Sequence, residues 1–398
     1  MYLAASLAYR HLSKDRPEIY LSYLAVTLGN LGALYENTQR MKQAEIVLIR
    51  VVGTYREFGI KNNSVSYLSC IVTALDNLGV VYQNTQRMEK AESSLTQALD
   101  IQRKLAQIQP ASYRPQLVVR LDDLGKFYRK TNRLEQAEKA FREAVAISRE
   151  LVREDRSRYL PDLAMTLNNT GNLYYDTGRE KEAEETYGEA LTYYRELMKL
   201  STAHYISDMA LTLNNLGSIY MKTERYVDAE AAYTAALANC RELSNSNPVL
   251  YSPSVPLILN NLGKLYSQTE RTEDAEKAYA ESVEGYRKLV INNPATYSPY
   301  LAQTLCNLGG LYLQSGHIEA GARTCTESLA IYRQLVKANP AAYGNGLSMV
   351  LLEMSVIVSA PGPSEPSRCS FATEASQVAV SVSMRQTAIS ALKQLCGN

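Results

Sequence analysis

The chain has 398 residues, and its 42 Lys and Arg against 41 Asp and Glu give a net charge of +1. So small a charge provides no field that would attract nucleic acid or a membrane surface, and neither is an expected partner. The six cysteines show no CxxC spacing and there are only three histidines, which argues against a metal site, a metal cofactor or a disulfide framework and fits a cytoplasmic location. No apolar run is long enough to cross a membrane, and residues 1–16 show no signal-peptide pattern.

The first predicted element is a helix at the start of the chain, within residues 1–20. Its Tyr2, Ala5, Arg10 and Leu12 match the second helix of a unit that recurs later in the chain. We therefore predict that residues 1–20 are a half repeat, which lacks the first helix of its unit.

An eight-residue word follows and occurs seven times, as in LNNLGSIY at residues 213–220. Each copy contains a glycine, called here the octet glycine, and positions in a repeat are counted from it. Successive octet glycines lie 47 and then five times 46 residues apart. A fixed period of this length predicts a solenoid, in which each unit packs against its neighbours. The octet glycines are Gly32, Gly79, Gly125, Gly171, Gly217, Gly263 and Gly309.

Each octet lies in a predicted amphipathic helix, called helix A. Apolar residues at positions −8, −4, −1, +2 and +3 fall on one side of this helix, with Leu always at −4 and Tyr always at +3. Prolines, which suit the first turn of a helix, mark its expected start. They are Pro115, Pro161, Pro253, Pro256 and Pro299.

A polar break, such as residues 176–179, separates helix A from a second periodic run, helix B, such as residues 182–197. Position +12 is alanine in six copies and glycine in the last, so that together with the octet glycine it predicts a close antiparallel approach of the two helices. We predict an all-α fold, a right-handed α-solenoid of seven antiparallel helix pairs with a half repeat at each end, forming one domain over residues 1–358.

The predicted array ends in a half repeat at residues 343–358, where Tyr343, Leu347 and Leu351 match helix A. Residues 359–398 are predicted to be a Pro- and Ser-rich linker and a disordered tail, although 381–395 has the spacing of a short docking helix. An unpaired helix at each end suggests head-to-tail association between chains. The alternative is a truncated gene product whose ends fray or are covered by residues 381–395.

The order Leu, Leu-Gly, Tyr, Ala, aromatic, Ala within each unit resembles the tetratricopeptide repeat (TPR). The unit differs from that family's 34-residue repeat because it has 46 residues and carries Arg where the family closes with Pro. Its wording is most similar to kinesin-light-chain-type repeats and bacterial signalling arrays. The resemblance implies that one face of the A helices lines a concave groove in which an extended peptide lies.

Positions −2 and −6 lie on that implied groove face, away from the apolar stripe of helix A. A carboxamide at −2 can pair with both the C=O and the N–H of a peptide unit, and apolar residues at −6 can receive side chains. The alternative is that the −2 carboxamide bonds to the neighbouring repeat and fixes the angle between repeats. Position −2 is Asn30, Asn77, Asp123, Asn169, Asn215, Asn261 and Asn307, and position −6 is Val26, Thr73, Val119, Met165, Leu211, Leu257 and Gln303.

Charged residues on the same face predict a polar, mixed-charge ligand. The acids are Asp76, Asp122, Asp123 and Asp176, and the bases are Lys126, Lys130, Lys222 and Lys264. No repeat supplies the Lys/Asn/Arg cluster of a carboxylate clamp. Arginines at +8 and +24 are interpreted as structural ion pairs rather than anion sites.

No nucleophile elbow, Gly-rich phosphate loop or HExxH motif is present, so we predict a non-catalytic scaffold with no cofactor and a protein or peptide ligand. The alternative function is a regulatory TPR array from a larger signalling protein whose catalytic domain lies elsewhere.

Overall fold

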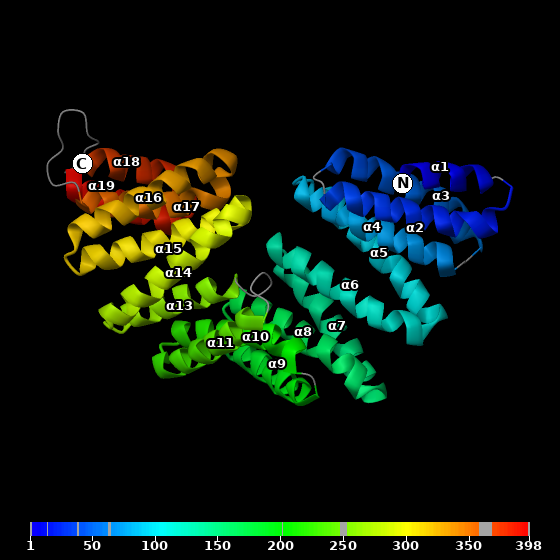
Figure 1. Ribbon diagram of the computed structural model, residues 1–398, viewed down its shortest axis with the longest axis horizontal. Helices are drawn as coiled ribbons and strands as arrows, with labels where there is room; N and C mark the ends of the chain where they lie inside the picture. Colours follow the sequence, from blue (N-terminus) through cyan, green and yellow to red (C-terminus); the bar gives the residue numbers. More distant parts are fainter. Residues whose placement is uncertain are drawn as a thin grey trace. The chain divides into compact units, whose positions relative to one another are not determined.

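The computed structural model describes residues 2–13, 15–37, 40–62, 65–200, 202–246, 253–357 and 368–396. Within these ranges all regular structure is α-helical, as predicted. The helices (Figure 1) are α1 (Tyr2–Leu12), α2 (Pro17–Asn37), α3 (Met41–Asn62), α4 (Val65–Asn84), α5 (Met88–Ile108), α6 (Pro110–Lys130), α7 (Leu134–Glu154), α8 (Arg156–Asp176), α9 (Glu180–Leu200), α10 (Thr202–Lys222), α11 (Tyr226–Ser246), α13 (Ser254–Gln268), α14 (Thr272–Asn292), α15 (Pro294–Gln314), α16 (Ile318–Ala338), α17 (Pro340–Ile357), α18 (Arg368–Val378) and α19 (Val382–Cys396).

The helices form an α-solenoid in two compact units, Met1–Tyr193 and Tyr194–Asn398, and the boundary falls within α9. This division differs from the single domain predicted over residues 1–358. In the first unit each helix from α1 to α7 packs against the next one along the chain. In the second unit the same holds for α10 to α19 in their order.

The octet glycine is the point at which helix A receives a side chain of helix B. A Cβ added at Gly125 would lie 2.7 Å from the ring of Phe141, and one added at Gly217 would lie 2.7 Å from the ring of Tyr233. The residue received is at +16 for each of the six octet glycines whose surroundings the structure describes, while the alanine or glycine at +12 is also buried. The predicted close approach is confirmed at both positions, because a Cβ added to Gly321 at +12 would lie 3.3 Å from the backbone oxygen of Gly309. The sequence did not predict the contact of the +16 side chain, which lies against the octet glycine itself. The +16 residues are Leu95, Phe141, Tyr187, Tyr233, Tyr279 and Cys325.

The polar break between helices A and B contains a residue in the left-handed conformation. It lies at +7, and two of the six described examples are glycines, Gly178 and Gly316, with φ of 70° and 77°. The other four have φ of 58–59° although they carry side chains, and they are Gln86, Asn132, Glu224 and Glu270. The turn therefore has the same geometry in six repeats, whichever residue supplies it.

Arginines at +8 and +24 form ion pairs between neighbouring repeats, as predicted. Arg87 donates to both carboxylate oxygens of Glu45 at 2.8 Å, and its guanidinium lies 4.7 Å from the centre of the Tyr82 ring. Arg103 at +24 pairs with Glu143 of the following repeat at 2.7 Å. Arg87 and Arg103 thus each link two repeats, and Arg87 also covers the tyrosine that recurs at +3.

The A helices begin earlier than the prolines suggested. Helix α6 begins at Pro110 and α15 at Pro294, so Pro115 and Pro299 lie inside these helices rather than in the first turn. The side chain of Asn293 accepts a hydrogen bond from the backbone N–H of Thr296 at 3.2 Å and caps α15. The prediction for Pro115, Pro161 and Pro299 was wrong because helices α8 and α15 begin at the Asp155 and Asn293 caps. Helix α6 begins at Pro110, after Gln109, whose side chain makes no cap bond.

Residues after the linker are helical, which corrects the prediction of a disordered tail. Helix α18 packs on α17, and Phe371, Ala375 and Ala388 are buried in a core with Leu351. Arg333 pairs with Glu374 at 2.8 Å, as Arg287 pairs with the helix B residue Glu327 at 2.7 Å. Helix α18 therefore supplies helix B of an eighth unit. The C-terminal helix A is thus already partnered, which removes the basis for head-to-tail association at this end.

Two further expectations need correction. Helix α4 is long and apolar enough to cross a membrane, with a mean hydropathy of 1.4 over 18 residues. Half of that window is buried inside the protein, as is found for core helices.

The state of the cysteines also differs from the expectation. Four of them are free thiols, namely Cys70, Cys240, Cys306 and Cys325, whereas Cys369 is disulfide-bonded. The expectation of a chain without disulfides is therefore wrong at Cys369, while the cytoplasmic location stays a prediction.

Candidate functional site

The asparagines at −2 are used, in three repeats, to bond the preceding repeat. Asn169 Nδ2 donates to both carboxylate oxygens of Asp122, at 3.0 and 2.9 Å. The same bond joins Asn261 to Asn214 at 2.8 Å and Asn307 to Asn260 at 3.0 Å. Every acceptor is at −3 of the preceding repeat. We call the bonds at these three junctions the amide ladder. They correspond to the alternative in which the −2 carboxamide bonds to the neighbouring repeat.

The ladder has a different chemistry at its C-terminal end. Glu353 occupies −2 of the eighth helix A, and both Cys306 Sγ and Cys325 Sγ donate to its Oε2, at 3.4 and 3.3 Å. Burial raises the pKa of Glu353 to about 7 and also raises the pKa of both thiols. Among the described residues, no group of three or more His, Cys, Asp or Glu side chains could hold a metal ion. The sequence reasoning missed this cluster because the eighth unit lacks the octet glycine.

Charged residues on the predicted groove face of the first unit are paired with one another. Lys126 Nζ lies 3.1 Å from the carboxylate of buried Asp122 and 2.7 Å from that of exposed Asp123. Asp76 pairs with Arg120 at 2.9 Å, yet burial outweighs the guanidinium and raises the pKa of Asp76 to about 6. Asp176 likewise pairs with Arg129 at 3.2 Å, so all four acids named from the sequence are in ion pairs. Lys130 in the first unit and Lys222 and Lys264 in the second unit are exposed.

The residues at −6 form a row of accessible apolar side chains. Val26, Val119 and Met165 of the first unit are 59%, 41% and 37% exposed. Leu211 and Leu257 of the second unit are partly buried. The prediction that this position faces outward beside the −2 asparagines is consistent with these exposures.

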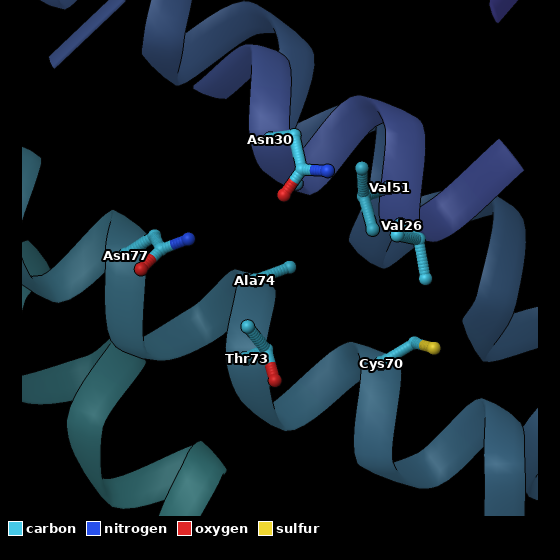
Figure 2. Close-up of a pocket in the computed structure, with 8 residues that line it drawn as sticks. Val26, Asn30, Val51, Cys70, Thr73, Ala74 and Asn77 are labelled. Atoms are coloured by element: carbon cyan, nitrogen blue, oxygen red, sulfur yellow. The ribbon is translucent and has the colours of Figure 1, made fainter. Parts of the chain in front are cut away.

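A pocket of about 220 Å³ lies at the first junction, between α2 and α4, and Val51 of α3 also contributes to its wall. Figure 2 shows the carboxamides of Asn30 and Asn77 at one end of it and Val26, Thr73 and Cys70 around the remainder. The remaining lining residues are Gly29 and Ala74. Both −2 asparagines and both −6 residues of the first two repeats are thus brought together around one cavity.

The ladder has no rung at this junction, and the cause is visible in the sequence. Asn77 at −2 would need an acceptor at −3 of the first repeat, but that residue is Gly29. Within the described part of the chain, neither the side chain of Asn30 nor that of Asn77 has a hydrogen-bond partner. Asn215, by contrast, is half-buried and does interact with another residue. The break in the row of polar −3 residues could have located the pocket before the structure was known.

Comparisons with known proteins agree with this architecture. A profile of the tetratricopeptide repeat family matches residues 70–150, 121–196 and 208–288, together more than half of the chain. No curated protein matches the chain. Among solved structures, BtubC (BKLC) from P. vanneervenii is 24% identical with a TM-score of 0.53, covering 62% of this chain and 92% of that one.

Two other solved structures share the fold at the same TM-score of 0.53. One is a signal transduction ATPase with numerous domains and a TPR sensor, PH0952 from Pyrococcus horikoshii, 14% identical, where the match covers 85% of this chain and 50% of that one. The other is the apo form of RapI, 15% identical, covering 79% and 99%. On its repeat pattern, its helix pairs and the family match, the chain belongs to the tetratricopeptide repeat family.

Proposed function

We propose that this TPR scaffold binds an extended segment of a protein partner along the −6 and −2 positions of its A helices and catalyses no reaction on it. The observation that carries the proposal is that position −6 is apolar in five of the seven repeats, exposed at Val26, Val119 and Met165 and partly buried at Leu211 and Leu257. An apolar side chain gains stability by leaving water, so a row of them favours a ligand that offers side chains at intervals.

The charges beside this row support a ligand with both signs. In the first unit, Asp123 and Lys126 are paired but partly accessible, so a ligand charge can exchange with either partner. In the second unit, exposed Lys264 favours an acidic residue of the ligand. A partner of mixed charge would match both units better than a uniformly basic or acidic one.

The test selects ligands from a display library of unstructured peptides on the full chain and measures binding by fluorescence anisotropy. The variant is Val119→Ser with Met165→Ser, both on the −6 row. The matched control is Val227→Ser with Ile291→Ser, which are 84% and 80% exposed but lie elsewhere. We expect the first pair to weaken binding and the control pair to leave it unchanged, with equal melting temperatures. Equal loss in both pairs would refute the groove assignment.

The second candidate function is a regulatory array within a larger signalling protein. The likeness to an ATPase that carries a TPR sensor favours it, since this chain matches half of that protein. That likeness concerns the fold alone. Sequencing the gene on both sides of this segment decides the matter, because an ATPase or protease domain in the same reading frame would support the regulatory function and a stop codon on both sides would oppose it.

A further inference from the structure

We infer that the pocket at the first junction binds one uncharged aliphatic side chain of the partner, together with the peptide unit beside it. This inference rests on the proposed function. It assigns the binding of one ligand side chain to a single pocket, whereas the proposed function spreads ligand contacts over many repeats. It starts from the amide ladder, because the ladder shows which −2 asparagines are already used and which are available to a ligand.

The missing rung creates the space. At the junctions of Asn261 and Asn307, the side chain at −3 of the preceding repeat fills the gap between consecutive A helices and accepts the amide hydrogen. At the first junction this side chain is absent, and a Cβ added to Gly29 would meet no atom within 4 Å. The glycine therefore leaves open space where the later junctions have a hydrogen-bonded side chain.

The missing rung also leaves two carboxamides available. Asn30 of α2 and Asn77 of α4 both line the pocket, and Figure 2 shows their amide ends on the same side of it. A carboxamide carries a donor and an acceptor, so each can pair with the C=O and N–H of one peptide unit whatever its side chain. Two such groups on one side of a cavity suit a backbone that runs across its mouth.

The walls of the pocket select the side chain that enters. Val26, Val51 and Ala74 are apolar, Thr73 and Cys70 are weakly polar, and none of the eight lining residues is charged. The volume of about 220 Å³ exceeds the ~150 Å³ of an apolar cavity that accepts benzene. A branched aliphatic side chain therefore fits, whereas a charged one would be placed without a partner of opposite sign.

Cys70 provides a direct report on occupancy. It is partly accessible and lines the pocket, whereas the free thiols of Cys240, Cys306 and Cys325 are buried. The experiment uses the full chain and measures the rate at which iodoacetamide alkylates Cys70, by mass spectrometry of the peptide that contains it. Burial raises the pKa of this thiol, so the reaction is run at mildly alkaline pH.

The probes are end-blocked peptides that differ only in a central Leu, Gly or Asp. We expect the Leu peptide to slow alkylation of Cys70 and the Gly and Asp peptides to leave its rate unchanged at the same concentration. Asn77→Ala should weaken the Leu peptide on the order of tenfold, since the backbone pairing is lost.

The deciding variant is Gly29→Asn, which restores the residue found at −3 in the junctions of Asn261 and Asn307. It should bond Asn77, fill the pocket and abolish protection by the Leu peptide. Gly29→Ala is the matched control, because it adds only a Cβ in open space and leaves the amide of Asn77 without a partner. Both variants should melt no lower than the parent protein, since glycine is the poorer helix former.

Equal protection by the Leu and Gly peptides, or retained protection in Gly29→Asn, would overturn this inference. If labelled peptides still bind the array in those experiments, the proposed function survives and only the pocket assignment fails. If no peptide binds the parent protein, both fail. Should Gly29→Asn melt early, the Asn77→Ala variant decides by the same measurement, and an unchanged affinity there overturns the inference.

Discussion

At the scale of single residues, two kinds of residue that are unfavourable in a helix recur in helix A, a glycine in all seven octets and an asparagine at −2 in six of them. The glycine makes room for the +16 side chain, because any Cβ at Gly171, Gly217 or Gly263 would come within 2.6–2.7 Å of a tyrosine ring. The −2 asparagines Asn169, Asn261 and Asn307 join neighbouring repeats through the amide ladder. Both residues thus serve packing between helices rather than the stability of the helix that contains them.

Gly217→Ala is expected to destabilise the second unit by about 1–3 kcal/mol, because the tyrosine ring at Tyr233 must move out of a packed position. Thermal unfolding followed by circular dichroism measures the effect, with Gly29→Ala as the control at a glycine surrounded by space. Gly217→Leu should be worse, and hydrogen exchange should show lost protection in the adjoining repeats. Similar melting of Gly217→Ala and Gly29→Ala would contradict this role of the octet glycine.

Asn261→Ala should cost about 1 kcal/mol or more of stability, since it leaves the buried side chain of Asn214 without its donor. Asn30→Ala, at a position with no partner, should leave the melting temperature unchanged. Denaturant titration of both variants provides the comparison. A larger loss in Asn30→Ala than in Asn261→Ala would show that the ladder contributes nothing to folding.

The carboxyl of Glu353 should make the second unit less stable as pH rises. Its pKa is about 7 in the folded protein against a normal 4.5, so the folded state keeps a proton that the unfolded chain releases between these values. Stability contributed by the neutral acid is complete below pH 4.5 and is lost as pH rises through 7, on the order of 3 kcal/mol. Glu353→Gln should remove this slope in denaturation midpoints measured from pH 5 to pH 8, and an unchanged slope would disprove it.

At the scale of helices, the recurring unit predicted where each helix lies but not the residue at which it begins. Periodicity at +3 and −4 located helix A because seven copies repeat the same pattern. The first residue of helix A was misplaced because a proline is easily recognised in a sequence, whereas a capping residue is not. Asn293 and Asp155 cap their helices by a single side-chain bond to a backbone N–H. The interior prolines lie near enough to the N-terminus that only one helical bond is lost.

The left-handed residue at +7 offers a stabilising change within the A–B turn. Glu270 has φ of 59°, a conformation that Gly178 and Gly316 adopt at the same position without a side chain. Glu270→Gly should therefore raise stability, by about 1 kcal/mol at most. Gly316→Ala should lower it by a similar amount, and differential scanning calorimetry of the two variants tests the pair together. A destabilised Glu270→Gly would show that its side chain matters more than its backbone.

At the scale of the whole molecule, the repeat phase predicted the solenoid, while the C-terminal end was missed. The sequence of residues 368–396 does not match helix B closely and follows a Pro- and Ser-rich segment, so it was read as disordered. What makes it fold is tertiary: α17 presents Leu347, Val350 and Leu351, which need a partner, and α18 buries Phe371 and Ala375 against them. A short helix that is marginal alone becomes stable on such a surface.

Removing residues 359–398 should destabilise the C-terminal repeats. The truncation exposes the apolar face of α17, and the Arg333–Glu374 pair is lost with it. Because stability in a repeat array passes between neighbours, hydrogen exchange should rise in α17 and α16 before it rises in α13. Unchanged exchange in α16 and α17 would mean that α18 and α19 contribute nothing to the fold of this unit.

Gene duplication can lengthen an array of this kind without disturbing its joints. Each rung of the amide ladder takes its donor from one repeat and its acceptor from the repeat before it, 47 residues away. A copied unit therefore arrives with both halves of a joint and can be inserted between any two such repeats. Copying the unit that contains Gly29 would instead duplicate the gap and so create a second pocket of the same kind. Recombination among these repeats can thus change the length of the scaffold and the number of such pockets independently.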